Sequence, residues 1–148
     1  MVEVSCYSLF DEDENNNQVK YSPNPEHRND NPMKSQWTIL EEEELECFRV
    51  AYKSGWKREN NAWGLHFTCN NTQFGYLGLG RDRNIKLFIA KFKNDVPHET
   101  WHGYPADYQQ NSHDVPETEI LRSWVKNNIL GKAKMRKIIR GEPCKLSG

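Results

Sequence analysis

The chain has 148 residues, of which 36% are hydrophobic and 28% are charged. This length suits one domain with a modest core, to which five tryptophans, six tyrosines and six phenylalanines contribute. No apolar run approaches the roughly 20 residues of a membrane-spanning helix. The N-terminus also lacks the basic start and apolar stretch of a secretory signal. We therefore expect a cytoplasmic protein that makes no use of a membrane.

The near-neutral net charge of −1 hides a division of the chain into two oppositely charged parts. Residues 1–47 carry 12 acidic and 3 basic side chains, a net charge of −9. Residues 48–148 carry 9 acidic and 17 basic side chains, a net charge of +8. Such asymmetry bears on the choice of partners more than the overall charge does.

The N-terminal region combines a short strand with a long polar segment. Val2, Val4 and Cys6 would lie on one face of an extended segment, with Tyr7 and Leu9 on the other, which predicts a strand. Residues 11–36 are rich in Asn, Asp, Glu and Pro and show no periodicity. We expect them to form a long, exposed, flexible loop, with room for a short strand at 18–21.

A helix is predicted over residues 39–54. Thr38 and Glu41 have the spacing of a capping box, and four consecutive glutamates occupy the first turn, where the helix dipole favours negative charge. Gly55 is a typical helix stop. The apolar side chains of this helix are Leu45, Phe48, Val50 and Tyr52.

Three strands are predicted next, over 62–69, 74–80 and 84–92. Residues 84–92 are apolar on both faces, which is typical of a central strand. The three glycines within 74–80 fit no phosphate-binding pattern, and they indicate a bulged or closely approached strand. We expect residues 101–108 to form an ordered aromatic loop, with Trp101 and Tyr104 packed against the rest of the protein.

The C-terminal part predicts a helical hairpin over 114–141. Asp114 is its expected N-cap, and the apolar residues of the first helix share one face. A second short helix precedes the stop at Gly141. The fold class is therefore α+β, as a single domain with a small antiparallel sheet of four or five strands, one packed helix and the C-terminal helical hairpin.

His98-Glu99-Thr100-Trp101-His102 matches the His-Glu-x-x-His pattern of zinc hydrolases. That chemistry needs both histidines one turn apart on a helix, with Glu99 beside the metal-bound water. Proline precedes the motif, and Gly103 and Pro105 follow it, which disfavours such a helix. We therefore expect no metal, no cofactor and no catalysis here, and we keep His98 and His102 as candidate ligands and Glu99 as candidate base of a third hypothesis.

The predicted hairpin is strongly basic. Its second helix places positive side chains around much of its circumference, which suits binding to phosphates or to an acidic surface. Nucleic-acid binding is therefore the second hypothesis. It rests on Lys132, Lys134, Arg136, Lys137 and Arg140.

The first hypothesis is a small non-catalytic protein that recognises another macromolecule, of the kind that neutralises a toxin or an enzyme (an immunity protein or inhibitor). It follows from segregated charge and from the lack of a catalytic constellation in the sequence. The expected partner is a protein with a basic surface. The residues expected to contact it are Asp11, Glu12, Asp13, Glu14, Glu41, Glu42, Glu43, Trp101 and Tyr104.

Overall fold

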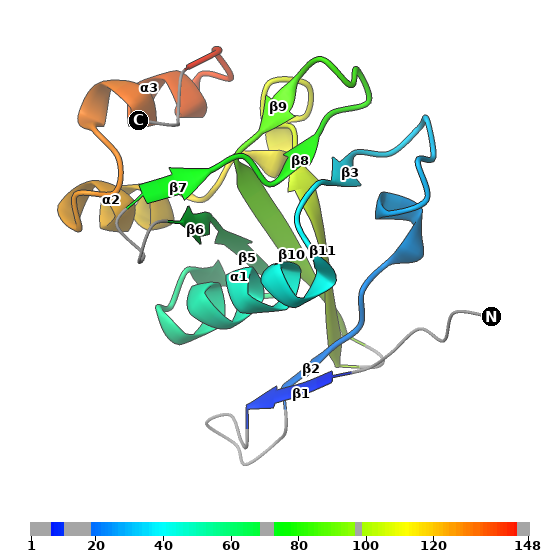
Figure 1. Ribbon diagram of the computed structural model, residues 1–148. Coiled ribbons are helices and arrows are strands. Elements are labelled where there is room, and N and C mark those ends of the chain that lie inside the picture. The colour runs from blue at the N-terminus through cyan, green and yellow to red at the C-terminus, as the bar shows by residue number, and fades with distance from the viewer. Residues whose placement is uncertain (1–6, 11–18, 69–72, 97–98, 145–148) are drawn as a thin grey trace.

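The main sheet has six strands in the spatial order β1-β2-β11-β10-β5-β4 (Figure 1). Its neighbours are antiparallel except for β2 and β11, which run parallel. The computed structural model describes residues 7–10, 19–68, 73–96 and 99–144. The strands are β1 (Tyr7–Phe10), β2 (Val19–Tyr21), β4 (Lys57–Arg58), β5 (Asn61–Gly64), β10 (Ile89–Asp95) and β11 (Thr100–Ala106).

Two smaller sheets complete the β structure. One has the order β3-β8-β9, and the other pairs β6 with β7. The predicted strands over 62–69 and 74–80 are thus each divided between two sheets. The bounds are β3 (Gln36–Trp37), β6 (His66–Thr68), β7 (Gln73–Gly75), β8 (Gly78–Leu79) and β9 (Lys86–Leu87).

Strand β10 is central, as its two apolar faces predicted, because it pairs with β5 on one side and β11 on the other. On one face Phe92 packs against helix α1 (Glu41–Lys53). On the opposite face Lys91 donates through Nζ to the His113 carbonyl and lies over the Trp63 ring. Both faces are covered, and this accounts for the apolar character of the strand.

Helix α1 lies on the main sheet and supplies the centre of an aromatic core (Figure 1). The Phe48 ring centroid lies 5.0 Å from that of Tyr21, 5.3 Å from Phe92 and 5.4 Å from Trp101. Aromatic pairs at such separations add to the free energy gained by burying apolar surface. The helix was predicted from its capping residues, its glutamate-rich first turn and its glycine stop, and its Phe48 side chain is one that meets the sheet.

The start of α1 differs from the prediction. Leu40, not Thr38, precedes the helix, and its N–H donates to Glu43 Oε1 at 2.9 Å. The Thr38 N–H donates instead to the Leu77 carbonyl at 2.9 Å, which extends the β3–β8 pairing. Thr38 is therefore held by the small sheet and does not cap the helix. The helix ends at Lys53, and Gly55 follows in the left-handed conformation expected of a stop.

Most of the 101–108 segment belongs to strand β11, so the prediction of an aromatic loop was wrong. Strand β11 pairs with β10 along its full length, from Thr100 opposite Asp95 to Ala106 opposite Ile89. Proline is tolerated in it because β2 pairs with β11 only at Thr100 and Trp101. At Pro105 the strand therefore pairs with only one other strand of the main sheet, β10.

Residues 19–36 also differ from the exposed loop that their composition indicated. The short predicted strand is present as β2, and Tyr21 is fully buried. A 3-10 turn, Pro25–His27, follows. Arg83 then holds the segment in place, because its guanidinium donates to Asp30 Oδ1 and to the carbonyls of Asn31 and Lys34 at 2.9–3.2 Å. Residues 11–18 of the predicted loop lie outside the described residues.

The C-terminal helical hairpin is confirmed as α2 (Thr118–Lys126) and α3 (Lys132–Ile139). Ile120, Leu121 and Trp124 of α2 are buried, as their spacing predicted. Asp114 is not the cap, because its carboxylate accepts hydrogen bonds from Tyr104 Oη and the Asp107 N–H. In the described part of the chain, no helix has the length and apolarity that a membrane crossing requires.

Candidate functional site

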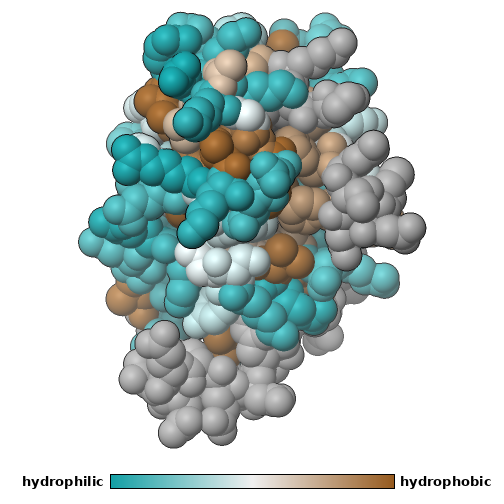
Figure 2. Space-filling view, turned by 90° about the vertical axis from the view of Figure 1, so that its left-hand side faces the viewer, coloured by the Kyte–Doolittle hydropathy of each residue, from teal (hydrophilic) through white to brown (hydrophobic). Residues whose placement is uncertain are grey.

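A pocket of about 450 Å³ lies between α1, β6 and the segment that joins α2 to α3. We call it the acidic–aromatic pocket. Figure 2 views the molecule from the side on which α2 and α3 lie, and small hydrophobic areas there are bordered by hydrophilic side chains. The lining residues are Glu43, Glu46, Cys47, Val50, Trp56, His66, Phe67 and Ile129.

The α1 residues of this pocket share one face because they are spaced three or four apart. Glu43, Glu46, Cys47 and Val50 follow this spacing, and they place two carboxylates beside a thiol and a branched apolar side chain. The Cys47 thiol is buried, and burial raises its pKa above the ordinary range. Cys47 therefore contributes to the pocket as an apolar, protonated group.

The opposite wall is aromatic. The ring centroids of Trp56 and Phe67 lie 6.3 Å apart, and Trp56 also meets Trp124 edge to face at 5.6 Å. The backbone N–H of Trp56 donates to the Ala51 carbonyl at 2.9 Å, which fixes this tryptophan directly after the helix. The wall is therefore apolar and held by the core.

The acidic rim stays accessible to a cation. Glu46 is 58% exposed and pairs with Arg49, which is itself 41% exposed, at 2.7 Å. His66 Nε2 lies 3.8 Å from Glu43 Oε2, and the Glu43 side chain is 42% exposed. An exposed ion pair such as that of Glu46 with Arg49 contributes little stability, so a partner could replace it at small cost.

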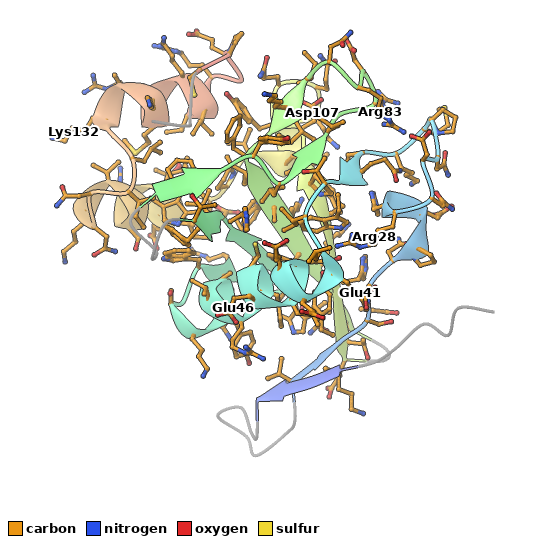
Figure 3. All side chains as sticks on the ribbon, in the orientation of Figure 1. Arg28, Glu41, Glu46, Arg83, Asp107 and Lys132 are labelled. Atoms are coloured by element: carbon orange, nitrogen blue, oxygen red, sulfur yellow. The ribbon has the colours of Figure 1, made fainter. Side chains whose placement is uncertain are left out.

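The structure separates the predicted acidic residues into different roles. Glu42 is exposed, and Glu41 and Glu43 are half-buried on the first turn of α1. Glu44, within the same run, is fully buried and pairs with Arg28 at 2.8 Å. Figure 3 shows Glu41 and Glu46 on α1, with Arg28 directed toward the helix. The predicted contacts Asp11, Glu12, Asp13 and Glu14 lie outside the described residues.

Neither aromatic residue that was predicted to meet a partner lies in this pocket. Trp101 is buried in the core against Phe48 and offers no surface for contact. Tyr104 is half-buried on the other face of β11, and its hydroxyl donates to Asp114 Oδ1 at 2.7 Å. Trp101 and Tyr104 therefore do not share one surface, because alternate residues of β11 point to opposite faces of the sheet.

The His-Glu-x-x-His segment does not form the helix that a zinc hydrolase requires. Glu99 has a φ of 50° in the turn before β11, and His102 lies within the strand opposite Lys93. His98 is outside the described residues. Among those described, no group of three or more His, Cys, Asp or Glu side chains lies close enough to hold a metal ion.

None of the five basic residues predicted to bind nucleic acid lines the acidic–aromatic pocket. Lys132, Arg136, Lys137 and Arg140 are exposed, and Lys134 is half-buried. Arg140 pairs with Glu142 at 3.0 Å. Figure 3 shows Lys132 at the start of α3, on the opposite edge of the view from Arg83.

A second pocket, of about 420 Å³, lies where the 27–35 segment meets the end of β11. We call it the polar pocket. In it the His27 ring stacks on Tyr104, with centroids 5.3 Å apart and planes at 18°. Its lining residues are His27, Met33, Lys34, Ser35, Arg81, Tyr104, Pro105, Asp107, Gln110, Asn111 and Asp114.

Several groups of the polar pocket are already satisfied within the protein. Ser35 Oγ donates to the Pro105 carbonyl at 2.7 Å. Asp114 accepts from Tyr104 Oη at 2.7 Å and from the Asp107 N–H at 3.1 Å. Burial raises the pKa of Tyr104, and the neighbouring Asp114 raises it further, so the phenol stays protonated and donates. These hydrogen bonds hold one wall of the polar pocket in place. They do not involve Asp107 Oδ1, which has no hydrogen-bond partner among the described residues.

Sequence reasoning missed the polar pocket because its residues come from four separate segments. His27, Ser35, Arg81 and Asp107 carry no local motif, and no spacing between them repeats. Only the chain reversals at β8–β9 and after β11 bring them together. Comparison with protein-family models, with curated proteins and with solved structures gave no match to this chain.

Proposed function

We propose that this is a non-catalytic binding protein that recognises a protein with a basic surface. The carrying observation is the acidic–aromatic pocket, in which Glu43 and Glu46 border an apolar cavity lined by Trp56 and Phe67. We assign an arginine or lysine side chain of the partner to this cavity. Neutralisation of a toxin or an enzyme is the activity that we propose for such a complex.

The chemistry of a long basic side chain matches this pocket. Its aliphatic stem gains free energy from contact with apolar surface, while its charged head stays near water or a carboxylate. The cation also gains from an aromatic face within about 6 Å. Glu41 and Glu42 extend the negative charge along α1, so a basic partner surface would be attracted before it docks.

Replacing Glu43 and Glu46 together by glutamine is expected to slow association with the partner by about tenfold at low salt. The amides keep the shape of the side chains and remove the charge that attracts a basic surface. The measurement has two steps. Proteins captured from nuclease-treated lysate by wild type and by the double variant are first compared, and the association rate of the captured protein is then measured at several salt concentrations.

Glu26→Gln combined with Glu59→Gln is the matched control, because it also removes two charges and both residues are exposed and lie outside this pocket. It should capture the same protein as wild type at the same rate. A partner that binds the double variant as fast as wild type, with the same dependence on salt, would contradict the assignment of this surface.

Nucleic-acid binding through α3 is the second candidate. The observation in its favour is that Lys132, Arg136 and Lys137 are exposed and that the described part of the chain offers them no ion pair. Arg136→Ala combined with Lys137→Ala should weaken binding to a labelled DNA duplex by about tenfold and reduce the salt slope by about two. Fluorescence anisotropy between about 50 and about 200 mM salt measures both effects.

Lys20→Ala combined with Lys53→Ala removes the same charge from β2 and α1 and serves as the control. If this pair weakens DNA binding as much as the α3 pair does, the binding follows net charge and does not locate a site. DNA binding that does not respond to salt would contradict the candidate altogether.

A further inference from the structure

The polar pocket contains a hydrogen-bond acceptor that the protein leaves unused. Asp107 Oδ1 is buried and has no hydrogen-bond partner among the described residues. Leaving a buried carboxylate oxygen unpaired costs free energy, of the order of 1–3 kcal/mol or more for a charged group. Burial raises the pKa of Asp107, and the Gln110 and Gln109 backbone amides and Arg81 offset this only in part. Such an atom in a native structure requires an explanation, and a bound ligand is one.

A second acceptor in the same pocket is Nε2 of His27. The Nδ1 atom lies 2.9 Å from the Ser35 carbonyl oxygen, which can only accept, so Nδ1 carries the proton. Burial lowers the pKa of His27, and the positive charge of Lys34 lowers it further, while Glu26 and the Ser35 carbonyl act in the opposite direction. The ring is therefore neutral at physiological pH, and Nε2 presents a lone pair.

The pocket also has cationic donors at its rim. Lys34 and Arg81 are exposed and line it, and neither side chain has a hydrogen bond or ion pair within the described residues. The nearby Arg83 is different, since its guanidinium donates to Asp30 and to three backbone carbonyls. Two arginines two positions apart therefore have separate roles, one holding the loop and one left free.

We propose that the polar pocket binds a small zwitterion, a free α-amino acid. Its ammonium group donates to the Asp107 carboxylate and to His27 Nε2, and its carboxylate accepts from Arg81 and Lys34. Each charge of the ligand then meets an opposite charge, and the unpaired Oδ1 atom of Asp107 gains a donor. A simple anion would instead face the Asp107 carboxylate without compensation.

The size and the walls of the pocket agree with this ligand. Its volume of about 420 Å³ lies within the range of small-molecule sites. The Asp114 carboxylate differs from that of Asp107, because both of its oxygens already accept hydrogen bonds within the protein. Met33, which is largely exposed, supplies apolar surface for the ligand's side chain. This site is separate from the acidic–aromatic pocket and does not depend on the function proposed for it.

The test is a titration of ¹⁵N-labelled protein with each standard amino acid in turn, at millimolar concentration. At least one should shift the amide signals of Ser35, Tyr104 and Asn111. Its N-acetyl and carboxamide derivatives, which each lack one charge, should bind at least about tenfold more weakly. Arg81→Ala and Asp107→Asn should each weaken binding of the intact amino acid by a similar factor.

Arg122→Ala, which removes an exposed arginine from α2, is the control and should bind as wild type does. Thermal melting of each variant checks that the fold is intact. The proposal is overturned if no amino acid shifts these signals or if the N-acetyl and carboxamide derivatives, which keep one charge each, bind equally well. It is also overturned if ribose 5-phosphate binds in the pocket and amino acids do not, because the site would then recognise a hydroxylated anion.

Discussion

Replacing Gly103 by alanine is expected to lower the free energy of unfolding by about 3 kcal/mol. A Cβ atom at this position would lie 2.2 Å from Cδ1 and 2.6 Å from Cε1 of Phe92, and 3.0 Å from the Lys91 carbonyl oxygen. Phe92 has no exposed surface and packs against Tyr21, Trp37 and Phe48, so its ring has no space to move. Urea denaturation followed by tryptophan fluorescence measures the change.

Gly131→Ala provides the matched control, since a Cβ there meets nothing within 4 Å. Its free energy of unfolding should stay within about 0.5 kcal/mol of wild type. Phe92→Leu in the Gly103→Ala background should recover part of the loss, because the smaller side chain removes the clash. Equal stability of the two alanine variants would show that the Phe92 ring does not lie as close to Gly103 as the structure places it.

Replacing Glu44 by alanine is expected to destabilise the protein by about 3–5 kcal/mol. Glu44 Oε1 accepts from Arg28 Nη2 at 2.8 Å and from Nε at 3.2 Å, and Oε2 accepts from Tyr21 Oη. Alanine would leave the fully buried Tyr21 hydroxyl without an acceptor and Arg28 without its partner. Urea denaturation again measures the difference.

Glu44→Gln should cost less, about 1 kcal/mol or below, because the amide oxygen still accepts from one of the donors. Burial raises the pKa of Glu44, although hydrogen bonds from Tyr21 and Arg28 lower it, so losing the negative charge itself is not the main cost. Equal losses for alanine and glutamine would indicate that charge, and not the missing acceptor, holds these segments together.

These two sites connect the core to both proposed binding regions. Arg28 also donates to the Ile39 carbonyl at 2.9 Å, so the Glu44 network joins the 22–36 segment to the start of α1. The same helix carries Glu43 and Glu46 of the acidic–aromatic pocket. Gly103 lets β11 pack closely on β10, and Tyr104 next to it forms a wall of the polar pocket. Binding measurements on variants of either site therefore need a stability control.

The amino-acid sequence by itself determined the elements whose signals are local. The α2–α3 hairpin and the central position of β10 follow from the pattern of apolar residues. Helix α1 follows from its glutamate-rich first turn and from Gly55, which marks its end. The α+β class follows from these elements. Local periodicity is informative here because each of these elements buries one face, or both, in a regular pattern.

Only the tertiary structure decided which residues cap, pair and line pockets. Thr38 and Asp114 have the residue type and spacing of helix caps, yet distant partners, Leu77 for one and Tyr104 for the other, take their hydrogen-bonding groups. Residues 101–106 form a strand despite glycine and proline, because β10 supplies the pairing that local propensity does not. Pairings and pockets depend on contacts between segments far apart in the chain, and no short stretch of sequence encodes them.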